Sequence, residues 1–446
     1  MLPSNLNDNA TFLNHQPLWP ASWVERVGII GLYLFALSSM ASVSAANIGL
    51  GLMLLSFIVS SKAWRSMSHE PIFWLCLTLI VYISLRAIWA AQEFPSISNL
   101  PMNRAKSWIL LFLFFIVGWW LAGDSRHTAI VLVLALAGFT LGILSSPDAS
   151  LLLSLIPKNV RSGMHYDKAI LFGFHCAVMI LGLLVFAPRW LRRNRQRAPW
   201  VPVFLAIATL VMALFFLQGM IISQSRGVWL AALVVIPVTA FLFHRKSAWQ
   251  HANGKRRWLL WLLIPAVVTL VAATNWNLIW KRLSPEGQTL TIVLQQGLDK
   301  APLSSSSYRL SMWRFGIEKW SERPIFGWGP GSTQLLVEQE PEKVYPHPSG
   351  EPWDHLHSVY VELLLQLGLT GAALVAAIIV LLTKGVVDAY RSNRLPRDLF
   401  YFFTACLALT AIYSLTDFRH LQWNWRFFWL LFAGIGFASQ MNPASR

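Results

Sequence analysis

The sequence predicts an all-α polytopic membrane protein, and two features of its composition carry that prediction. Of its 446 residues, 55% are hydrophobic and only 13% are charged, whereas a soluble domain carries about 25% charged residues. The apolar residues also gather in long runs, and a membrane-spanning helix needs about 20 mainly apolar residues. The chain is therefore too apolar for a soluble domain and contains enough runs for many spans.

Twelve apolar runs are predicted to be membrane spans. They cover residues 27–44, 46–60, 71–91, 107–122, 127–145, 169–188, 199–221, 227–243, 257–273, 357–382, 398–416 and 425–440. The first two runs are nearly continuous. We divide them at the small polar segment "SVSAAN", because the whole stretch exceeds the length of one span.

The distribution of Lys and Arg predicts the orientation of these spans. Alternate connections are basic and together carry 17 Lys and Arg, against 8 in the short connections on the other side. The basic side of a membrane protein faces the cytoplasm, so both termini are expected inside. The net charge of +16 is then explained mainly by the basic connections on the cytoplasmic side. The basic segments are short and form no nucleic-acid-binding module, so a nucleic-acid partner is not expected.

The N-terminus and the cysteines add little. The first 25 residues contain no Lys or Arg, so they do not have the pattern of a cleavable signal peptide. Cys76, Cys176 and Cys406 all fall inside predicted spans. A disulfide framework is therefore not expected, and the cysteines do not indicate the redox compartment.

One connection differs from the others. Residues 274–356 form a nearly charge-balanced outer loop that is rich in Trp, Pro and Gly. Its aromatic content argues against disorder, so we expect a folded cap on the outer membrane surface. Residues 306–323 are predicted to form an amphipathic helix. Its expected apolar face consists of Leu310, Trp313, Ile317 and Trp320.

Several basic residues fall on the outer side, where each has an ordinary explanation beside a functional one. Arg226 starts a span whose N-terminal N–H groups favour an anion, but arginines at helix ends also extend to lipid phosphates. Arg309 and Arg161 suit a solvated surface equally well. Arg86 lies about five residues inside its span, where it would either extend to the interface or line a polar cavity. The group Asp417, Arg419 and His420 suits a simple interfacial ion pair.

His357 is the strongest candidate for proton transfer. It stands at the N-terminus of a predicted span, where the helix dipole and partial burial both disfavour the imidazolium. A neutral imidazole is what a general base requires near pH 7. The alternative is a histidine that only caps the helix or lies at the interface.

The spacing around His357 resembles a family signature. His357 and Ser358 are followed by nine residues, then Gly368, two residues and Gly371. This resembles the His-[Asn/Ser/Gln]-x9-Gly-x-x-Gly signature of the bacterial O-antigen ligase family, which the protein O-oligosaccharyltransferases share. "SQSRGVWLA" resembles the Ser-Arg-Gly motif of that family, and "YRLSMWRFGIEKWSERPIFGWGPG" resembles its outer-loop motif with a Pro-x-x-Gly-x-Gly ending. The twelve predicted spans and the large loop extend the resemblance over essentially the whole chain.

The resemblance implies a glycosyltransferase of the bacterial inner membrane. The donor would be a polysaccharide on undecaprenyl diphosphate, and the acceptor a sugar hydroxyl of lipid A–core on the periplasmic face. The implied organisation has three parts: residues 1–273 with nine spans and a cytoplasmic N-terminus, a periplasmic loop at 274–356 that caps the active site, and residues 357–446 with three spans.

The resemblance also implies roles for single residues. His357 would be the general base, and Arg226 and Arg309 would bind the diphosphate, with Arg161 and Arg86 as further candidates for that site. Arginine suits phosphate oxygens through its bidentate fork. The sequence shows no Asp-x-Asp pair on the outer face and no Walker-type loop, so neither a metal, nor another cofactor, nor ATP is expected.

Some assignments stay open at this stage. Glu362 would orient His357 or an arginine, or serve as a buried structural partner, while Gly368 and Gly371 are expected to permit close helix packing. A protein O-oligosaccharyltransferase or an O-antigen polymerase would use the same donor. Protein O-oligosaccharyltransferases often carry an extra C-terminal soluble portion, and this chain ends six residues after its last predicted span, which favours the ligase over them. The His-x9-Gly-x-x-Gly spacing favours the ligase over the polymerase. A transporter would be expected to show charged spans and broken helices in corresponding halves, and neither pattern is clear.

Overall fold

The computed structural model describes residues 22–95, 99–121, 124–153, 160–166, 168–194, 198, 200–248, 269, 272–348 and 350–441. Within these ranges every regular element is helical, which confirms the predicted all-α class. The helices are α1 (Trp23–Ser38), α2 (Val43–Val59), α3 (Ser61–Met67), α4 (Pro71–Glu93), α5 (Asn99–Leu111), α6 (Phe114–Leu121), α7 (Ser125–Leu144), α8 (Ser150–Leu153), α9 (Ala169–Arg193), α10 (Trp200–Ile222), α11 (Arg226–Ala248), α13 (Trp276–Gln296), α14 (Ser305–Glu322), α15 (Ser332–Gln339), α16 (Val359–Arg391), α17 (Arg397–Ser414) and α18 (Trp423–Ala438).

Seven helices in the described part of the chain are long and apolar enough to cross a membrane. They are α4, the combined stretch Asn99–Leu121, α7, α9, α10, α11 as far as Phe243, and α16. An eighth span results if α2 and α3, which meet at an angle of 85°, are counted as one. Seven predicted runs correspond to these helices, which indicates a multi-pass membrane protein.

The other predicted runs have different outcomes. Those at 27–44, 46–60, 398–416 and 425–440 form the helices α1, α2, α17 and α18, which have only 16 to 18 residues. The run at 257–273 lies almost entirely outside the described residues. The total of twelve spans therefore stays a prediction. The first two helices separate at residues 39–42, where "SVSAAN" begins, because the Ser42 side chain accepts a hydrogen bond from the Ala45 N–H and starts α2 there.

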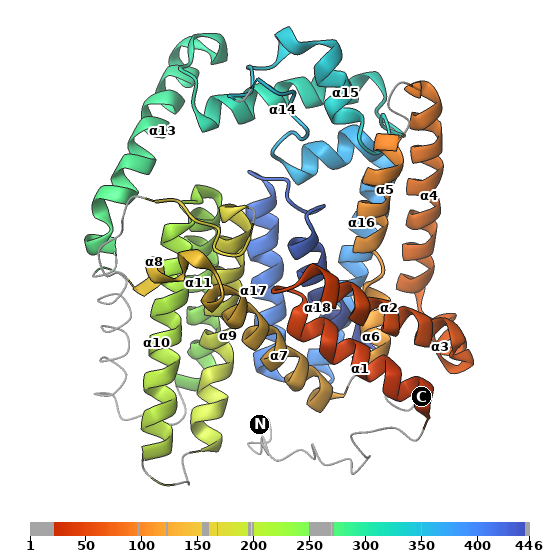
Figure 1. Cartoon of the computed structure of the whole chain (residues 1–446), viewed down its shortest axis with the longest axis vertical. Helices are drawn as coiled ribbons and strands as arrows, with labels where there is room; N and C mark the ends of the chain where they lie inside the picture. Colours follow the sequence, from red (N-terminus) through yellow and green to blue (C-terminus); the bar gives the residue numbers. More distant parts are fainter. Residues whose placement is uncertain are drawn as a thin grey trace, which may run out of the picture.

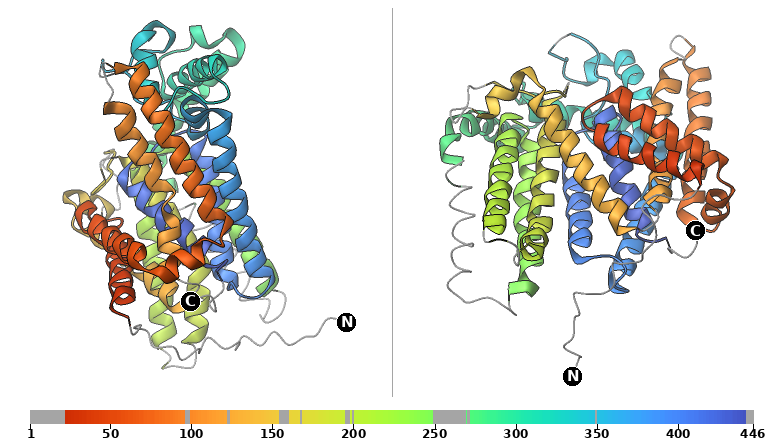
Figure 2. Two further views of the ribbon diagram at one scale, coloured as in Figure 1. Left: turned by 90° about the vertical axis from the view of Figure 1, so that its right-hand side faces the viewer. Right: turned by 60° about the horizontal axis from the view of Figure 1, so that its bottom comes forward.

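The predicted cap is folded and lies at one end of the bundle. Helices α13, α14 and α15 gather there, with α13 on one side and α15 near α4 and α5 (Figure 1), and the side view places the same segment at the same end (Figure 2). The cap has an apolar core of its own. That core consists of Met312, Phe315, Leu336, Val337, Val344, Trp353 and Leu356, together with Leu365 of α16.

The predicted amphipathic helix exists as α14, but the prediction of its buried face was wrong. The apolar residues that α14 buries are Met312 and Phe315, whereas Ile317 is 52% exposed. Gly316 lies against Leu356 and Val361, which leaves no room for a larger side chain on that side. The cap core therefore selects the face around Phe315, and the stripe through Ile317 remains partly exposed.

Gly368 interrupts α16 with a backbone conformation that is not helical (φ 62°, ψ −170°). A Cβ atom at this position would lie 2.4 Å from the Ile325 carbonyl oxygen and 2.5 Å from the Gly327 nitrogen. Glycine is needed here because the backbone of the turn at 324–329 approaches α16 directly. The expected close packing at Gly368 therefore involves this turn, rather than a second helix.

Candidate active site

A cavity of about 580 Å³ lies between the cap and the near ends of the bundle helices. Its wall combines cap residues from α13 and α14 with the turn between α10 and α11, the start of α9, and the segment after α17. Six cationic side chains line it, with Asp417 as the lining carboxylate. The six cations are Arg161, Lys168, Arg226, Arg282, Arg309 and Arg419.

Helix N-termini reinforce this positive charge. The first residues of α9, α11 and α14 line the cavity, and His357 lies two residues before the start of α16. Each helix N-terminus presents unpaired N–H groups and the positive end of the helix dipole. Four such ends around one cavity favour an anionic ligand.

Three cavity arginines are fixed by the same device, a hydrogen bond from Nε to a backbone carbonyl at a helix end. Arg161 donates to Ser223 O (3.1 Å), Arg282 to Gln224 O (3.3 Å) and Arg309 to Thr416 O (2.8 Å). Arg309 also donates to the hydroxyl of Ser305 on its own helix (2.7 Å). In the described part of the chain, the terminal nitrogens of Arg161 and Arg282 have no ion pair or hydrogen bond.

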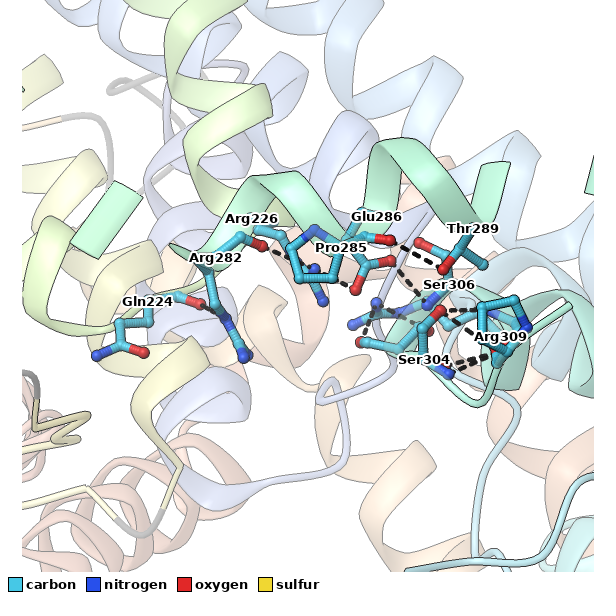
Figure 3. Close-up of polar contacts among 12 residues, drawn as sticks. Gln224, Arg226, Arg282, Pro285, Glu286, Thr289, Ser304, Ser306 and Arg309 are labelled. Atoms are coloured by element: carbon cyan, nitrogen blue, oxygen red, sulfur yellow. Dashed lines mark hydrogen bonds and ion pairs between the residues drawn. The ribbon is translucent and has the colours of Figure 1, made fainter. Parts of the chain in front are cut away.

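Arg226 is held differently, because it already has an anionic partner. Its guanidinium pairs with the Glu286 carboxylate from α13 and donates to the Arg282 carbonyl (3.1 Å). The other oxygen of Glu286 accepts from the Ser306 N–H at the start of α14 (3.2 Å). Figure 3 shows this chain of contacts running from Arg226 through Glu286 to Ser306, with Arg309 beside it. Burial raises the pKa of Glu286, but Ser306 and Arg226 together bring it below its ordinary value, so it is an anion.

The charges in this cavity repel one another when it holds no anion. Burial lowers the pKa of Arg309, and the opposing effect of Asp417 is partly cancelled by the charge of Arg226. Burial likewise lowers the pKa of Arg282, to which the charges of Arg226 and Arg161 add. Because arginine stays protonated in proteins, this repulsion is relieved by binding an anion.

A glycine brings two parts of this wall together. A Cβ atom on Gly227 would lie 2.3 Å from the Thr416 hydroxyl oxygen. The same Thr416 accepts the Arg309 hydrogen bond through its carbonyl. The glycine of the "SRG" motif thus lets the start of α11, with Arg226, pack against the end of α17, to which Arg309 is docked.

His357 reaches the cavity beside a buried carboxylate. Its Nδ1 lies 3.7 Å from Asp417 Oδ1, an ion-pair distance that is longer than a hydrogen bond. Burial lowers the pKa of His357, against the opposing effect of Asp417, so the imidazole is neutral at pH 7. Burial alone would raise the pKa of Asp417, but His357, Arg419 and Arg309 bring it below its ordinary value. The pair therefore consists of a neutral imidazole and an ionised carboxylate.

The backbone of His357 is held in a strained conformation. Its φ of 52° lies in the left-handed region, which a residue with a side chain rarely adopts. The His357 N–H donates to Nδ1 of His355 (3.2 Å), and the preceding Leu356 N–H donates to the Glu362 carboxylate (2.8 Å). Two hydrogen bonds thus fix the segment that presents the imidazole.

Glu362 belongs to a buried hydrogen-bond network, and its contacts indicate which of its predicted roles the structure favours. It is fully buried and accepts hydrogen bonds from Thr333 of the cap and from Gln366 (2.5 Å), besides the bond from Leu356. The side-chain amide oxygen of Gln366 in turn accepts from the Trp108 indole N–H of α5 (2.9 Å). Glu362 does not line the cavity. The contacts favour a structural role in which Glu362 holds the His355–His357 segment against α5, α15 and α16.

Arg86 is not brought into the cavity with the other predicted arginines. It is not among the residues that line the cavity, and its guanidinium donates to the Gly327 carbonyl (2.6 Å). The residue lies far enough inside α4 to reach the turn that packs on Gly368. Hydropathy predicts how deep Arg86 lies in the span, but it does not predict the direction in which the side chain points.

The structure also brings in residues that the sequence reading did not select. Lys168, Arg282, Tyr308, Trp353 and Asp417 all line the cavity. Asp417 was interpreted as the partner of Arg419, and that contact exists (3.4 Å), but its carboxylate also faces His357. Tyr308 and Trp353 contribute flat apolar surfaces of the kind on which sugar rings stack, and Trp353 lies edge-on to His357. The described residues include no group of three or more His, Cys, Asp or Glu that could hold a metal ion.

These features define a class: a multi-pass α-helical membrane protein with a cation-lined cavity beneath a folded cap. Residues 211–376 match the family model described as O-antigen ligase. The matched segment contains the motifs around Arg226, Arg309 and His357, so it supports the resemblance to the O-antigen ligase family. The match contains Arg226, Arg309 and His357, whereas Arg161 and Asp417 lie outside it. No curated protein matches the chain. The family supports glycosyl transfer of the O-antigen ligase or polymerase type.

Proposed function

We propose that this protein transfers O-antigen polysaccharide from undecaprenyl diphosphate to a sugar hydroxyl of lipid A–core. The observation that carries the proposal is the shared cavity of Arg161, Arg226, Arg309 and His357, four predicted residues that come from separate parts of the chain. The site would face the periplasm, and the protein would reside in the bacterial inner membrane, in line with the basic connections on the opposite side.

The arginines would bind the donor diphosphate. The leaving group gains negative charge as the glycosidic bond breaks, and fixed cations around it lower the energy of that transition state. Arg161 and Arg309 are held through Nε, so both terminal nitrogens of Arg161, and the one of Arg309 that does not contact Ser305, can serve phosphate oxygens without losing their anchor. Arg86 has no part in this site.

His357 would act as the general base. The acceptor hydroxyl oxygen attacks the anomeric carbon, its proton passes to the imidazole, and the bond to the diphosphate oxygen breaks. Because Nδ1 faces Asp417, the proton would be taken by Nε2. Asp417 would orient the ring and stabilise the imidazolium that forms. Attack from the side opposite the diphosphate would invert the anomeric configuration.

The donor supplies the energy of the reaction, because its diphosphate linkage is already activated. ATP is therefore not required. We also propose that the arginines perform the charge neutralisation for which many soluble transferases use a metal ion. Tyr308 and Trp353 would hold sugar rings beside the reacting atoms.

Two other transferases remain as alternatives with the same donor. A protein O-oligosaccharyltransferase would use a Ser or Thr acceptor, and an O-antigen polymerase would use a growing glycan. A membrane transporter is a more distant alternative. A transporter would need no catalytic base in the cavity at the cap-side end.

Reconstitution tests these alternatives directly. The purified protein in proteoliposomes would receive lipid-linked O-antigen together with either lipid A–core, a Ser/Thr peptide or a second lipid-linked glycan, without nucleotide and with excess EDTA. We expect product only with lipid A–core. Product on the peptide or on the second glycan would assign the corresponding alternative, and loss of activity on chelation, restored by Mg²⁺ or Mn²⁺, would overturn the metal-free mechanism.

A further inference from the structure

The turn at residues 324–329 leaves the cap and packs into the break in α16. Four backbone hydrogen bonds join the two segments, two in each direction. They run from Trp328 N to Leu365 O (2.8 Å), Gly329 N to Gln366 O (2.8 Å), Leu369 N to Pro324 O (2.9 Å) and Thr370 N to Ile325 O (3.0 Å). The turn is thus attached to the interior of a membrane-spanning helix, and not to its end.

The position of the turn along two spans gives its depth. On α4 it contacts Tyr82 and Arg86, which lie eleven and seven residues before the last residue, Glu93. On α16 it contacts residues 365–370, which lie six to eleven residues after the first residue, Val359. At a rise of 1.5 Å per residue, both helices place the turn about 10–15 Å inside their cap-side ends.

The lipid-facing surface of α4 continues past this level. Leu85, Ile88 and Trp89 are exposed, and all three lie between Tyr82 and the cap-side end of the helix. Exposed apolar residues on a spanning helix face hydrocarbon, and tryptophan marks the interface. The hydrocarbon layer therefore extends beyond the turn on its cap side.

The turn has the two properties that irregular backbone needs at this depth. Its carbonyls pair with protein groups, since Pro324 O and Ile325 O accept from the α16 backbone and Gly327 O accepts from Arg86 (2.6 Å). The single Tyr82 hydroxyl lies within hydrogen-bond distance of both Leu367 O (2.7 Å) and Phe326 O (3.2 Å). Non-helical backbone is tolerated in a bilayer only when its polar groups are paired within the protein. Its side chains are apolar and face outward: Ile325 and Phe326 are 56% and 54% exposed.

We propose that residues 324–329 form a membrane-embedded turn whose Ile325 and Phe326 side chains contact the acyl chains of the bilayer. The exposed surface of Leu369, whose N–H bonds to this turn, continues the same apolar face on α16. This continuity with the lipid-facing surface of α4 and α16 identifies the partner as bilayer hydrocarbon. The turn thereby anchors the cap in the membrane, and Arg86 donates the hydrogen bond that satisfies its Gly327 carbonyl. The proposal does not depend on glycosyl transfer.

Nitroxide labels test this placement. Single cysteines replace Ile325 and Phe326, with Leu369→Cys as the lipid-facing control and Asp299→Cys, on an exposed side chain of the cap, as the water-facing control. The natural Cys76, Cys176 and Cys406 are buried, and unlabelled wild-type protein verifies that they do not react. Collision with O2 and with Ni(II)-EDDA is measured in phosphatidylglycerol/phosphatidylethanolamine proteoliposomes.

We expect labels at 325 and 326 to collide more with O2 than with the nickel complex, as at 369, and the label at 299 to show the reverse. A label at 326 that behaves like the label at 299 would overturn the proposal. Protection from both reagents would also overturn it, because the partner would then be protein. Spin–spin broadening that disappears on dilution with unlabelled protein would identify that protein as a second copy.

Discussion

Nδ1 of His357 lies 3.7 Å from Oδ1 of Asp417, although α16 and α17 separate the two residues in the chain. One residue precedes the first helix of this pair and the other follows the second, so the two helices return the chain to the same end of the bundle. The same cavity holds Arg226 and Arg309. Three roles can therefore be tested separately: the general base, the carboxylate that orients it, and the cations that bind the anion.

Replacing His357 should separate the base from the anion-binding residues. Removing a general base costs about 10²–10⁴-fold in rate, while a neutral imidazole contributes little to binding a diphosphate. His357→Ala should therefore bind the lipid-linked donor normally and turn over by that factor more slowly. Arg226→Ala and Arg309→Ala should weaken donor binding as well, with lysine rescuing only part of it. Donor affinity and single-turnover rate in nanodiscs are the measurements. Equal loss of donor affinity in all three variants would show that His357 is a binding residue.

The pH dependence of turnover should report the His357–Asp417 pair. Burial lowers the pKa of His357 below its ordinary value, so the rate should be constant near pH 7 and fall only when the ring is protonated, below about pH 6.5. Asp417 raises the pKa of His357. Asp417→Asn should therefore move the acid limb to lower pH and reduce the plateau. An acid limb that stays in place, or moves upward, would contradict this assignment.

Glu362 should affect turnover only through His357. Glu362→Ala leaves the buried Leu356 N–H unpaired, which costs about 1–3 kcal/mol, and frees the strained His357 backbone. We expect a loss of about 10²-fold or less in turnover, with donor affinity unchanged. In the His357→Ala background the same substitution should cause no further loss. Thr333→Val, which removes another donor to Glu362 but leaves the Leu356 bond, is the matched control. Additive effects of Glu362→Ala and His357→Ala would show a general defect in folding.

Removing Glu286 should strengthen donor binding. The diphosphate has to compete with the Glu286 carboxylate for Arg226, so Glu286→Gln should lower the donor Kd by several-fold to about tenfold. The glutamine still accepts the Ser306 hydrogen bond, which preserves the α13–α14 contact. Glu338→Gln, an exposed residue of α15, should change nothing. Weaker donor binding with an unchanged melting temperature would mean that Glu286 positions Arg226 for the donor.

Reporter fusions should establish the side of the membrane on which the cavity lies. A reporter after Arg195 or Lys255 should report cytoplasm, and one inserted within 285–345 should report periplasm, because the basic connections face the cytoplasm. Alkaline phosphatase and green fluorescent protein fusions give complementary readouts. A cytoplasmic location for 285–345 would remove the proposed donor site from the periplasmic face.

Sequence reasoning identified most of the candidate site because charges beside apolar runs are conspicuous. It could not establish that Arg161, Arg226 and Arg309 converge, since convergence depends on backbone carbonyls at helix ends, such as Ser223 O and Thr416 O, that carry no sequence signal. The structure leaves Arg86 outside this cavity for a related reason. Hydropathy gives the depth of a residue in a span, but only the fold gives the neighbour toward which it points.

The buried face of α14 shows a second limit of the sequence. Apolar residues occur on more than one side of this helix, and periodicity alone cannot decide which side the cap core will cover. The structure buries Met312 and Phe315. It does so because the neighbouring Gly316 has no side chain, which allows Leu356 and Val361 to approach closely. The buried face of α14 is therefore determined by packing partners that are distant in the chain.

The division of the cationic wall between two parts of the protein has a thermodynamic consequence. Arg282 and Arg309 belong to the cap, while Arg161 and Arg226 belong to the bundle, so a diphosphate bound to both works as a removable cross-link. By mass action, saturating donor at 100 times its Kd would stabilise the docked cap by about 2.7 kcal/mol, which lowers the equilibrium population of the opened cap about 100-fold. Protease cleavage within the cap should therefore become a sensor of donor occupancy, even in a variant whose chemistry is abolished at His357.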